Sequence, residues 1–228
     1  MIMAVTYHRD LHQGSEEWHA ARCGLLTASE VRLILTPTLR VANNEKERAH
    51  LYELLAQRIT RYVEPSYISA DMLRGHEDEI EARIIYAEKY EPVQECGFIT
   101  NDKWGFTLGC SPDGLVGADG MIECKSRRQK YQIETIINGT VPDDYLLQVQ
   151  TALLVSERAW LDFISYCGGL PMVTIRVYPD AKVQSAILDA ASLFEERIER
   201  RLEEYRERMD GALRLVPTER RVEQEMVL

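Results

Sequence analysis

The sequence predicts an α/β (α+β) protein in which a central mixed β-sheet is flanked by helices. The first observation is the order of its patterned segments, which runs helices, strands, helix, strands, helix. The second is an ordinary globular composition, with 45% hydrophobic and 28% charged residues among 228. The third is that the sequence contains no internal repeat and no Gly/Ser/Pro-rich linker. We therefore expect residues 1–228 to form a single domain.

Two helices are expected in the first 65 residues. Thr27 and Glu30 fit a capping box, with Thr27 as the N-cap of a helix whose apolar stripe begins at Val31. A second helix is predicted over Glu45–Val63, where leucine, isoleucine and tyrosine recur at three- and four-residue spacing.

A third helix is predicted over Ser69–Tyr90, with an interruption at Gly75. The spacing of Ile80, Ile84 and Ala87 places these three apolar residues on one face of its second half.

The middle of the chain reads as strands. Two are expected over Val93–Thr100 and Trp104–Cys110, followed by a strong turn signal at Ser111–Gly114. Leu115–Val116 and Met121–Lys125 then form a hairpin, whose tip is Asp119-Gly120.

The last third of the sequence is expected to alternate between helices and strands. The predicted segments are a helix over Asp143–Val155, strands over Trp160–Tyr166 and Val173–Val177, and a long charged helix over Ala181–Gly211.

Charge, cysteines and hydropathy limit the classes of function. The formal net charge of −10 argues against a protein that coats nucleic acid, although one local basic surface would still allow DNA binding. The five cysteines are widely spaced and form no C-x-x-C motif, so we expect reduced thiols rather than a disulfide or zinc framework. No apolar run is long enough to span a membrane, and the first residues do not resemble a signal peptide. These features favour a cytoplasmic protein.

The residues most suited to chemistry are Asp113, Glu123 and Lys125. Residues two apart in a strand point to the same face, so Glu123 and Lys125 project together. Asp113 lies across the hairpin and can return beside Glu123. Two carboxylates and a lysine can bind a hard divalent cation and hold a water, as phosphodiester hydrolysis requires. Alternatively, Asp113 is a plain turn residue and the other two form a surface ion pair. We expect Asp119 to be structural, because it precedes Gly120 at a hairpin tip.

Four segments in order resemble one nuclease family. P-D, nine residues, then E-x-K is similar to the signature of the PD-(D/E)XK superfamily. The surrounding segments resemble motifs of the lambda exonuclease family, which also covers the YqaJ-type viral recombinases: WHAARCGLLTASEV at 18–31, GHEDE at 75–79, CSPDGL at 110–115 and QVQ at 148–150. The resemblance implies a PD-(D/E)XK, restriction-endonuclease-like core.

The resemblance also implies roles for the acidic residues and their neighbours. Asp113 and Glu123 would ligate Mg²⁺, or Mn²⁺ in its place, together with the backbone carbonyl of Cys124. Glu79 would add a carboxylate for a second ion, although three other acidic residues crowd the same helix: Glu77, Asp78 and Glu81. Lys125 would orient or deprotonate the attacking water.

Further residues are implied to contact the water or the DNA. Gln148 would hold the nucleophilic water or the scissile phosphate, the alternative being a buried bridging amide. Tyr145, three residues earlier on the same helical face, could also line the site. Arg22, Ser29 and Ser111 match family positions that hold the 5′-phosphate. Ser29 would lie in the first turn of the helix capped by Thr27, where an anion is favoured. For Arg22 the alternative is a plain surface arginine.

The densest group of basic residues follows the E-x-K motif. With Lys125, the group comprises Arg127, Arg128 and Lys130. We expect these residues to form a surface for the DNA backbone, the alternative being a solvated loop.

The resemblance implies a Mg²⁺-dependent 5′→3′ exonuclease of double-stranded DNA, with two ions in each site. It would release mononucleotides and leave a 3′ single strand for phage-type recombination. It would act on duplex ends with a single-strand annealing protein as partner, as a ring-shaped homotrimer. The alternatives are another PD-(D/E)XK nuclease, such as an endonuclease or a RecB-like enzyme, and a catalytically silent module that binds DNA ends.

Overall fold

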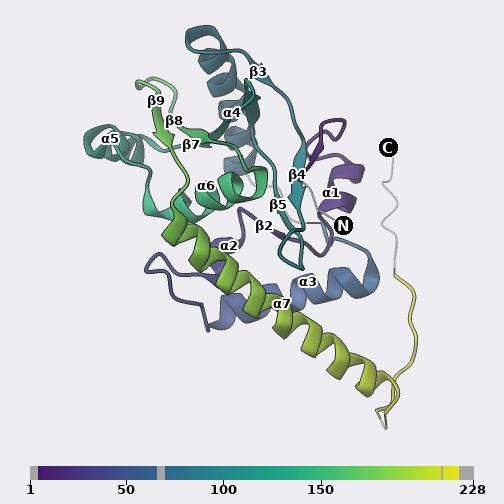
Figure 1. Ribbon diagram of the computed structural model, residues 1–228. Helices are drawn as coiled ribbons and strands as arrows, with labels where there is room; N and C mark the ends of the chain where they lie inside the picture. Colours follow the sequence, from purple (N-terminus) through teal and green to yellow (C-terminus); the bar gives the residue numbers. More distant parts are fainter. Residues whose placement is uncertain (1–4, 66–69, 212, 221–228) are drawn as a thin grey trace, which may run out of the picture.

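The computed structural model describes residues 5–65, 70–211 and 213–220 (Figure 1). None of the helices described there is long and apolar enough to cross a membrane. The elements, in chain order, are β1 (Thr6–His8), α1 (Glu16–Arg22), β2 (Leu26–Thr27), α2 (Val31–Ile34), α3 (Glu45–Thr60), α4 (Ala70–Lys89), β3 (Val93–Gln94), β4 (Phe98–Asn101), β5 (Leu108–Cys110), β6 (Gly114–Val116), β7 (Gly120–Ser126), α5 (Gln129–Asn138), α6 (Asp143–Ser156), β8 (Trp160–Tyr166), β9 (Val173–Val177) and α7 (Ala181–Met209).

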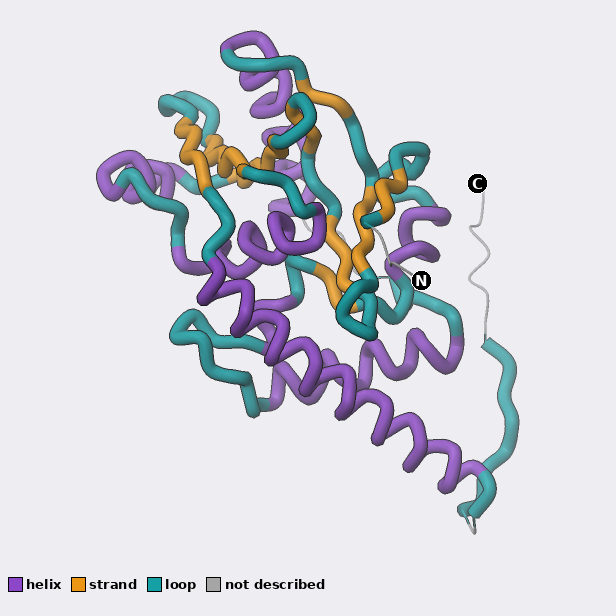
Figure 2. Tube along the Cα trace, in the orientation of Figure 1, coloured by secondary structure: helices purple, strands orange, loops and turns teal. Residues whose placement is uncertain are grey.

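The strands form two sheets rather than one central sheet (Figure 2). One has the order β1-β4-β5-β2 and the other the order β3-β6-β7-β8-β9. Both are mixed, because β2 pairs with β5, and β7 with β8, in parallel. The predicted strand Val93–Thr100 is divided between the sheets at Gly97. A Cβ atom there would lie 2.0 Å from the Leu11 carbonyl oxygen, so the two backbones meet where the strand breaks.

Helices cover both faces of the larger sheet. On one face, Ala82 and Tyr86 of α4 pack with Ile122 and Cys124 of β7 and with Ile164 of β8. On the other face lies α6, which contacts β8 and also β4 and β5 of the smaller sheet. The mixed α/β fold class with flanking helices is therefore confirmed.

Helix α4 runs through Gly75 without the predicted interruption, and Ser69 lies outside the described residues. The face that carries Ile80 and Ile84 is not the packed one, since these side chains are 38% and 47% exposed. The buried residues are instead Ala82 and Tyr86, one turn apart. Alanine and tyrosine carry a weaker hydrophobic signal than isoleucine, which explains the wrong prediction.

Several other boundaries differ from the prediction. The first helix after Thr27 begins only at Val31 and has Glu30 as its N-cap, without a side-chain cap. Half of the capping box is present, because the Thr27 amide donates to Glu30 Oε2 over 3.1 Å. The Thr27 hydroxyl donates to the same oxygen over 2.6 Å instead of accepting from the backbone, which keeps Thr27 outside the helix. Strands β8 and β9 have the predicted bounds.

Candidate active site

Strand β7 presents a charged face and an apolar face. Ile122 and Cys124 are fully buried against α4, as the alternation predicts. Glu123, only 3% exposed, and Lys125 point the other way, and their Oε1 and Nζ atoms are 2.5 Å apart. The pair is thus a buried ion pair rather than the surface pair considered as the alternative.

The Asp113 side chain is anchored beside this pair. Its backbone amide donates to the Ile122 carbonyl over 3.2 Å, and its Oδ2 accepts a hydrogen bond of 2.6 Å from the Cys124 amide. The carboxylate therefore does more than stabilise a turn, because it is held across the β6–β7 hairpin next to Glu123. Asp119, in contrast, is exposed at the hairpin tip and uses its carbonyl oxygen to accept from Ala159 and Trp160.

Two helices add side chains to Asp113 and Glu123, which together with Glu79 are called the acidic group below. Glu79 of α4 lines the same cavity as Asp113 and Glu123, whereas its neighbours Glu77 and Glu81 are exposed. From α6, Gln148 Nε2 donates to Glu123 Oε1 over 2.5 Å. The amide of Gln148 thus contacts the acidic group directly.

Burial and like charge raise the pKa values of the carboxylates. Burial first, and then the charge of Asp113, raise the pKa of Glu79 to about 8. Burial is also the main cause that raises the pKa of Asp113 and brings the pKa of Glu123 to about 7, against the effect of Lys125. Burial lowers the pKa of Lys125, but Glu123 and Asp113 outweigh it and raise that pKa overall. In the metal-free protein Lys125 is therefore a cation that donates a hydrogen bond to Glu123.

A cation with hydroxyl partners lies at the other end of the cavity. Arg22 donates to Ser111 Oγ over 3.0 Å and to Thr27 Oγ1 over 3.3 Å, and Thr27 Oγ1 lies 3.2 Å from Ser29 Oγ. Burial lowers the pKa of Arg22, but a guanidinium stays charged in proteins. Among the described residues, no carboxylate lies within ion-pair distance of it. A largely buried guanidinium bonded to neutral hydroxyls suits an added anion.

Trp18 lines the cavity beside the cluster formed by Arg22, Thr27, Ser29 and Ser111, which is called the arginine and hydroxyl cluster below. Its indole nitrogen donates to Gly97 O and Ser111 Oγ over 2.9 and 3.1 Å, and the Arg22 guanidinium lies 4.3 Å from its ring centroid. Sequence reasoning missed Thr27, which it assigned to a helix cap. The sequence does contain a signal for this role, because Thr27 and Ser29 are hydroxyl residues two apart in the same motif as Arg22.

Ser29 contacts this cluster, but not for the reason given by the sequence. It precedes the four-residue helix α2 and lies in a turn, so its position is not the N-terminal turn of a helix. What places Ser29 beside Arg22 is the hydroxyl contact with Thr27.

The basic residues after Lys125 do not form one loop. Lys125 faces the cavity, while Arg127 follows β7 and donates from Nη1 to the Tyr145 hydroxyl over 3.0 Å. Arg128 is the N-cap of α5 and Lys130 belongs to that helix, which the sequence analysis did not predict. Tyr145 also lies beside Lys125, 5.9 Å from Nζ to the ring centroid. Of the two arginines that follow Lys125, Arg127 is therefore the one whose partner, Tyr145, lies beside the acidic group.

One cavity of about 190 Å³ joins the acidic group to the arginine and hydroxyl cluster. Its lining includes Arg22, Thr27, Ser29, Glu79, Ser111, Asp113, Glu123, Lys125 and Gln148. The structure thus brings together nearly all the residues implied by the motifs. Tyr145, Arg127 and Arg128 do not line this cavity.

The acidic group fits a magnesium ion. Within the described parts of the chain, no three Asp, Glu, His or Cys side chains are gathered closely enough to hold a metal by themselves. Mg²⁺ does not require such a cage, because it keeps several waters and binds one or two carboxylates plus substrate phosphates. Asp113, Glu123 and the Cys124 carbonyl are hard oxygen donors of that kind, and their mutual repulsion would be relieved by a cation.

Residues 17–159 match the YqaJ-like viral recombinase domain, and this span contains every residue of the acidic group and the arginine and hydroxyl cluster. The chain belongs to the YqaJ-like viral recombinase family. It is similar to an alkaline exonuclease (LHK-Exo) from Laribacter hongkongensis, at 33% identity over 86% of this chain and 98% of that chain, with a TM-score of 0.77. A structure of LHK-Exo in complex with dAMP gives 35% identity over the same shares and a TM-score of 0.76. This member of the YqaJ-like family is accordingly a deoxyribonuclease of the exonuclease type.

A more distant structure shares the fold. A phage related exonuclease from Haemophilus somnus 129PT is 12% identical, with a TM-score of 0.57 over 79% of this chain and 96% of that chain. No curated protein has significant sequence similarity to this family member.

The raised pKa values predict how the metal-free protein responds to pH. Above about pH 4.5 the unfolded chain loses the Glu79 and Glu123 protons, whereas the folded chain retains the Glu123 proton up to about pH 7 and the Glu79 proton up to about pH 8, so stability falls as pH rises through this range. We expect Mg²⁺ to raise the Tm more at pH 8 than at pH 6, by on the order of 5 °C. Differential scanning calorimetry with and without Mg²⁺ measures both effects.

Glu79→Gln should flatten the pH dependence of the metal-free Tm, whereas the exposed Glu77→Gln should not. A Tm that rises from pH 5 to pH 8 in the absence of metal would contradict the raised pKa values.

Proposed function

We propose that this exonuclease digests one strand of duplex DNA from its 5′ end in a Mg²⁺-dependent reaction. It releases mononucleotides and leaves a 3′ single strand. The observation that carries the proposal is the single cavity, in which a cation with hydroxyl partners lies at one end and a carboxylate–lysine group at the other. The first suits a terminal phosphate and the second suits hydrolysis of the next phosphodiester bond.

Asp113, Glu123 and the Cys124 carbonyl would hold one Mg²⁺ or Mn²⁺ ion, and Glu79 would contribute to a second. When bound, the ions supply positive charge to the phosphoryl oxygens and lower the pKa of a nearby water. The chain's own residues position the reactants.

Water forms a new P–O bond while the bond from phosphorus to the 3′ oxygen of the terminal nucleotide breaks. Lys125 and Gln148 both donate to Glu123, and the remaining N–H groups of the two side chains can orient the water and the phosphoryl oxygens. Lys125 would orient or deprotonate the attacking water.

The proposed 5′ polarity rests on the position of the arginine and hydroxyl cluster, at the opposite end of the cavity from the carboxylates. A phosphate on Arg22, Ser29 and Ser111 would place the next phosphate of the strand toward the carboxylates. The structure of LHK-Exo with dAMP, a mononucleotide, supports a mononucleotide product for this chain as well. The Arg127–Tyr145 pair, with Arg128 further out, would contact the DNA backbone near the acidic group.

The wider role proposed is phage-type recombination in the cytoplasm, in which a single-strand annealing protein takes over the 3′ strand. We also propose a homotrimeric ring around the DNA. A net charge of −10 is a poor basis for holding DNA electrostatically over many turnovers, whereas a closed ring retains it by topology.

We expect Asp113→Ala, Glu123→Ala and Lys125→Ala each to lose Mg²⁺-dependent cleavage by about 100-fold or more, because each removes a charge from the reacting centre. Release of mononucleotides from a 5′-phosphorylated duplex is the measurement. Asp119→Ala, at the exposed hairpin tip, is the matched control and should cleave at the wild-type rate. Wild-type turnover in one of the three variants would remove that residue from the mechanism.

Duplex ends with a 5′-phosphate should be digested faster than 5′-hydroxyl ends, and Arg22→Ala should remove the preference. Charge-assisted hydrogen bonds to the phosphate are worth about 1.5–3 kcal/mol, or roughly 10- to 150-fold in rate. The ratio of initial rates on the two ends measures the preference. Equal rates in the wild-type protein would argue against a phosphate at Arg22.

The mass in solution, measured by light scattering at micromolar protein, should equal three chains. A monomer or dimer that still digests long tracts in each binding event would exclude the ring, without affecting the active-site assignments.

A further inference from the structure

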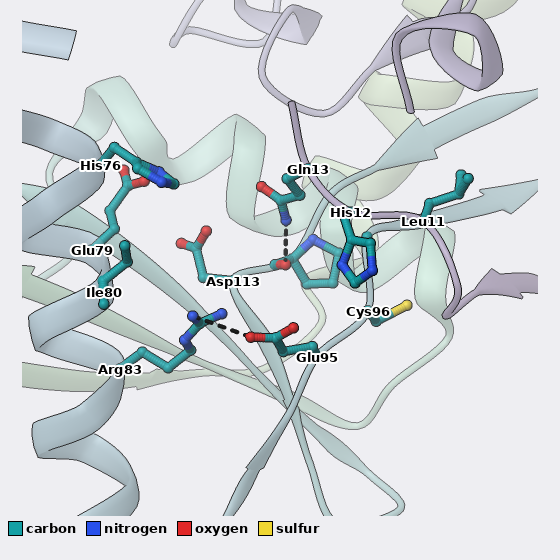
Figure 3. A pocket seen from close by; sticks show the side chains of 12 residues that line it. Leu11, His12, Gln13, His76, Glu79, Ile80, Arg83, Glu95, Cys96 and Asp113 are labelled. Carbon is teal, nitrogen blue, oxygen red and sulfur yellow. Dashed lines mark hydrogen bonds and ion pairs between the residues drawn. The ribbon is translucent and has the colours of Figure 1, made fainter. Parts of the chain in front are cut away.

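A second cavity continues beyond the acidic group. It has a volume of about 220 Å³ and shares Gln13, Glu79 and Asp113 with the first cavity (Figure 3). Arg22, Ser29 and Ser111 line only the first cavity, whereas His76, Arg83 and Glu95 line only the second. Asp113 and Glu79 therefore lie between the two, and none of the chemistry described so far uses the second.

The second cavity has an apolar part and a cationic part. His76, Ile80 and Arg83 project from α4 toward Asp113, and His12 lies across from them (Figure 3). Flat rings and an aliphatic side chain suit a sugar or a base. At about 220 Å³ the cavity is smaller than the roughly 300–1,000 Å³ of drug-sized ligand sites, so it suits part of a single strand rather than a duplex.

Arg83 is held by an ion pair that is easily exchanged. Its Nη2 lies 3.3 Å from Glu95 Oε1, and the Glu95 side chain is 67% exposed. Exposed pairs of this kind contribute little to stability, so a phosphate could replace the Glu95 carboxylate at little cost. A guanidinium also binds phosphate through two parallel hydrogen bonds, which a partly solvated carboxylate at this distance does not match.

In the proposed function, a bound strand would run from the first cavity into the second. With the terminal phosphate at Arg22 and the scissile phosphate at the carboxylates, the nucleotide that follows would lie beyond Asp113 and Glu79, which line both cavities. The second cavity begins there. Resting on the proposed function, we propose that it is the binding subsite for the second nucleotide of the digested strand, with Arg83 as the ligand of that nucleotide's 3′-phosphate.

The test uses short ligands that separate the subsites. Three are compared by calorimetry in Ca²⁺: the 5′-phosphorylated mononucleotide, the 5′-phosphorylated dinucleotide, and the same dinucleotide with a 3′-phosphate, with intactness checked by chromatography. Wild-type affinity should rise along the series, and the 3′-phosphate should add about tenfold, the value of one charge-assisted bond. Arg83→Gln should remove that last increment and leave mononucleotide affinity within about twofold.

Glu95→Gln is the matched variant in the same cavity. It removes the competing carboxylate, so the 3′-phosphate increment should be kept or enlarged. Equal affinity of the wild-type protein for the mononucleotide and both dinucleotides would overturn the subsite, and so would an Arg83→Gln variant that retains the full increment.

The same series distinguishes this failure from failure of the proposed function. Arg22→Ala should weaken all three ligands by the same factor, because each carries the 5′-phosphate. A series in which Arg22→Ala has no effect would contradict the 5′-phosphate site, whereas a series in which only Arg83→Gln has none would contradict the second subsite alone.

Discussion

The buried ion pair between Lys125 and Glu123 is the constraint on which the site depends. A carboxylate that is 3% exposed needs a partner for its charge, and β7 supplies one two residues later. The same alternation directs Ile122 and Cys124 into the contact with α4. A slip of one residue would bury both charges under α4 and place apolar side chains in the cavity. Register, core packing and charge therefore agree on one arrangement, and the Cys124 amide is left where it can anchor Asp113.

Much of this arrangement could be predicted from local patterns. Alternation in one strand was enough to pair Glu123 with Lys125, and the P-D-G turn was enough to return Asp113 across a short hairpin. Glu79 was harder to select among adjacent acidic residues, and only its place as the last residue of the GHEDE motif at 75–79 selected it. In the structure Glu79 lines the cavity, whereas Glu77 and Glu81 are exposed.

What could not be predicted depends on contacts between distant segments. Strand β2 has two residues and exists because it pairs in parallel with β5. Helix α5 packs with polar side chains facing the protein. Gln132 and Thr135 are buried, and Gln132 donates to the carbonyls of Ser165 and Pro171. Its isoleucines point outward, with Ile137 75% exposed, so hydrophobic periodicity gave no inward stripe to recognise. The contact between Arg22 and Ser111 likewise spans 89 positions of sequence.

Helix α6 has a further consequence, which follows from its contacts with both sheets. Ser111 directly follows β5 of the smaller sheet, whereas Glu123 and Lys125 belong to β7 of the larger one. The interval between the two ends of the cavity is therefore governed by a helix whose inner residues Val149 and Ala152 are almost wholly buried, and interiors of that density barely compress. In the proposed function, the packed core around α6 therefore fixes the distance between the phosphate site and the hydrolytic site. The step length along the DNA then depends on the core and not on flexible side chains.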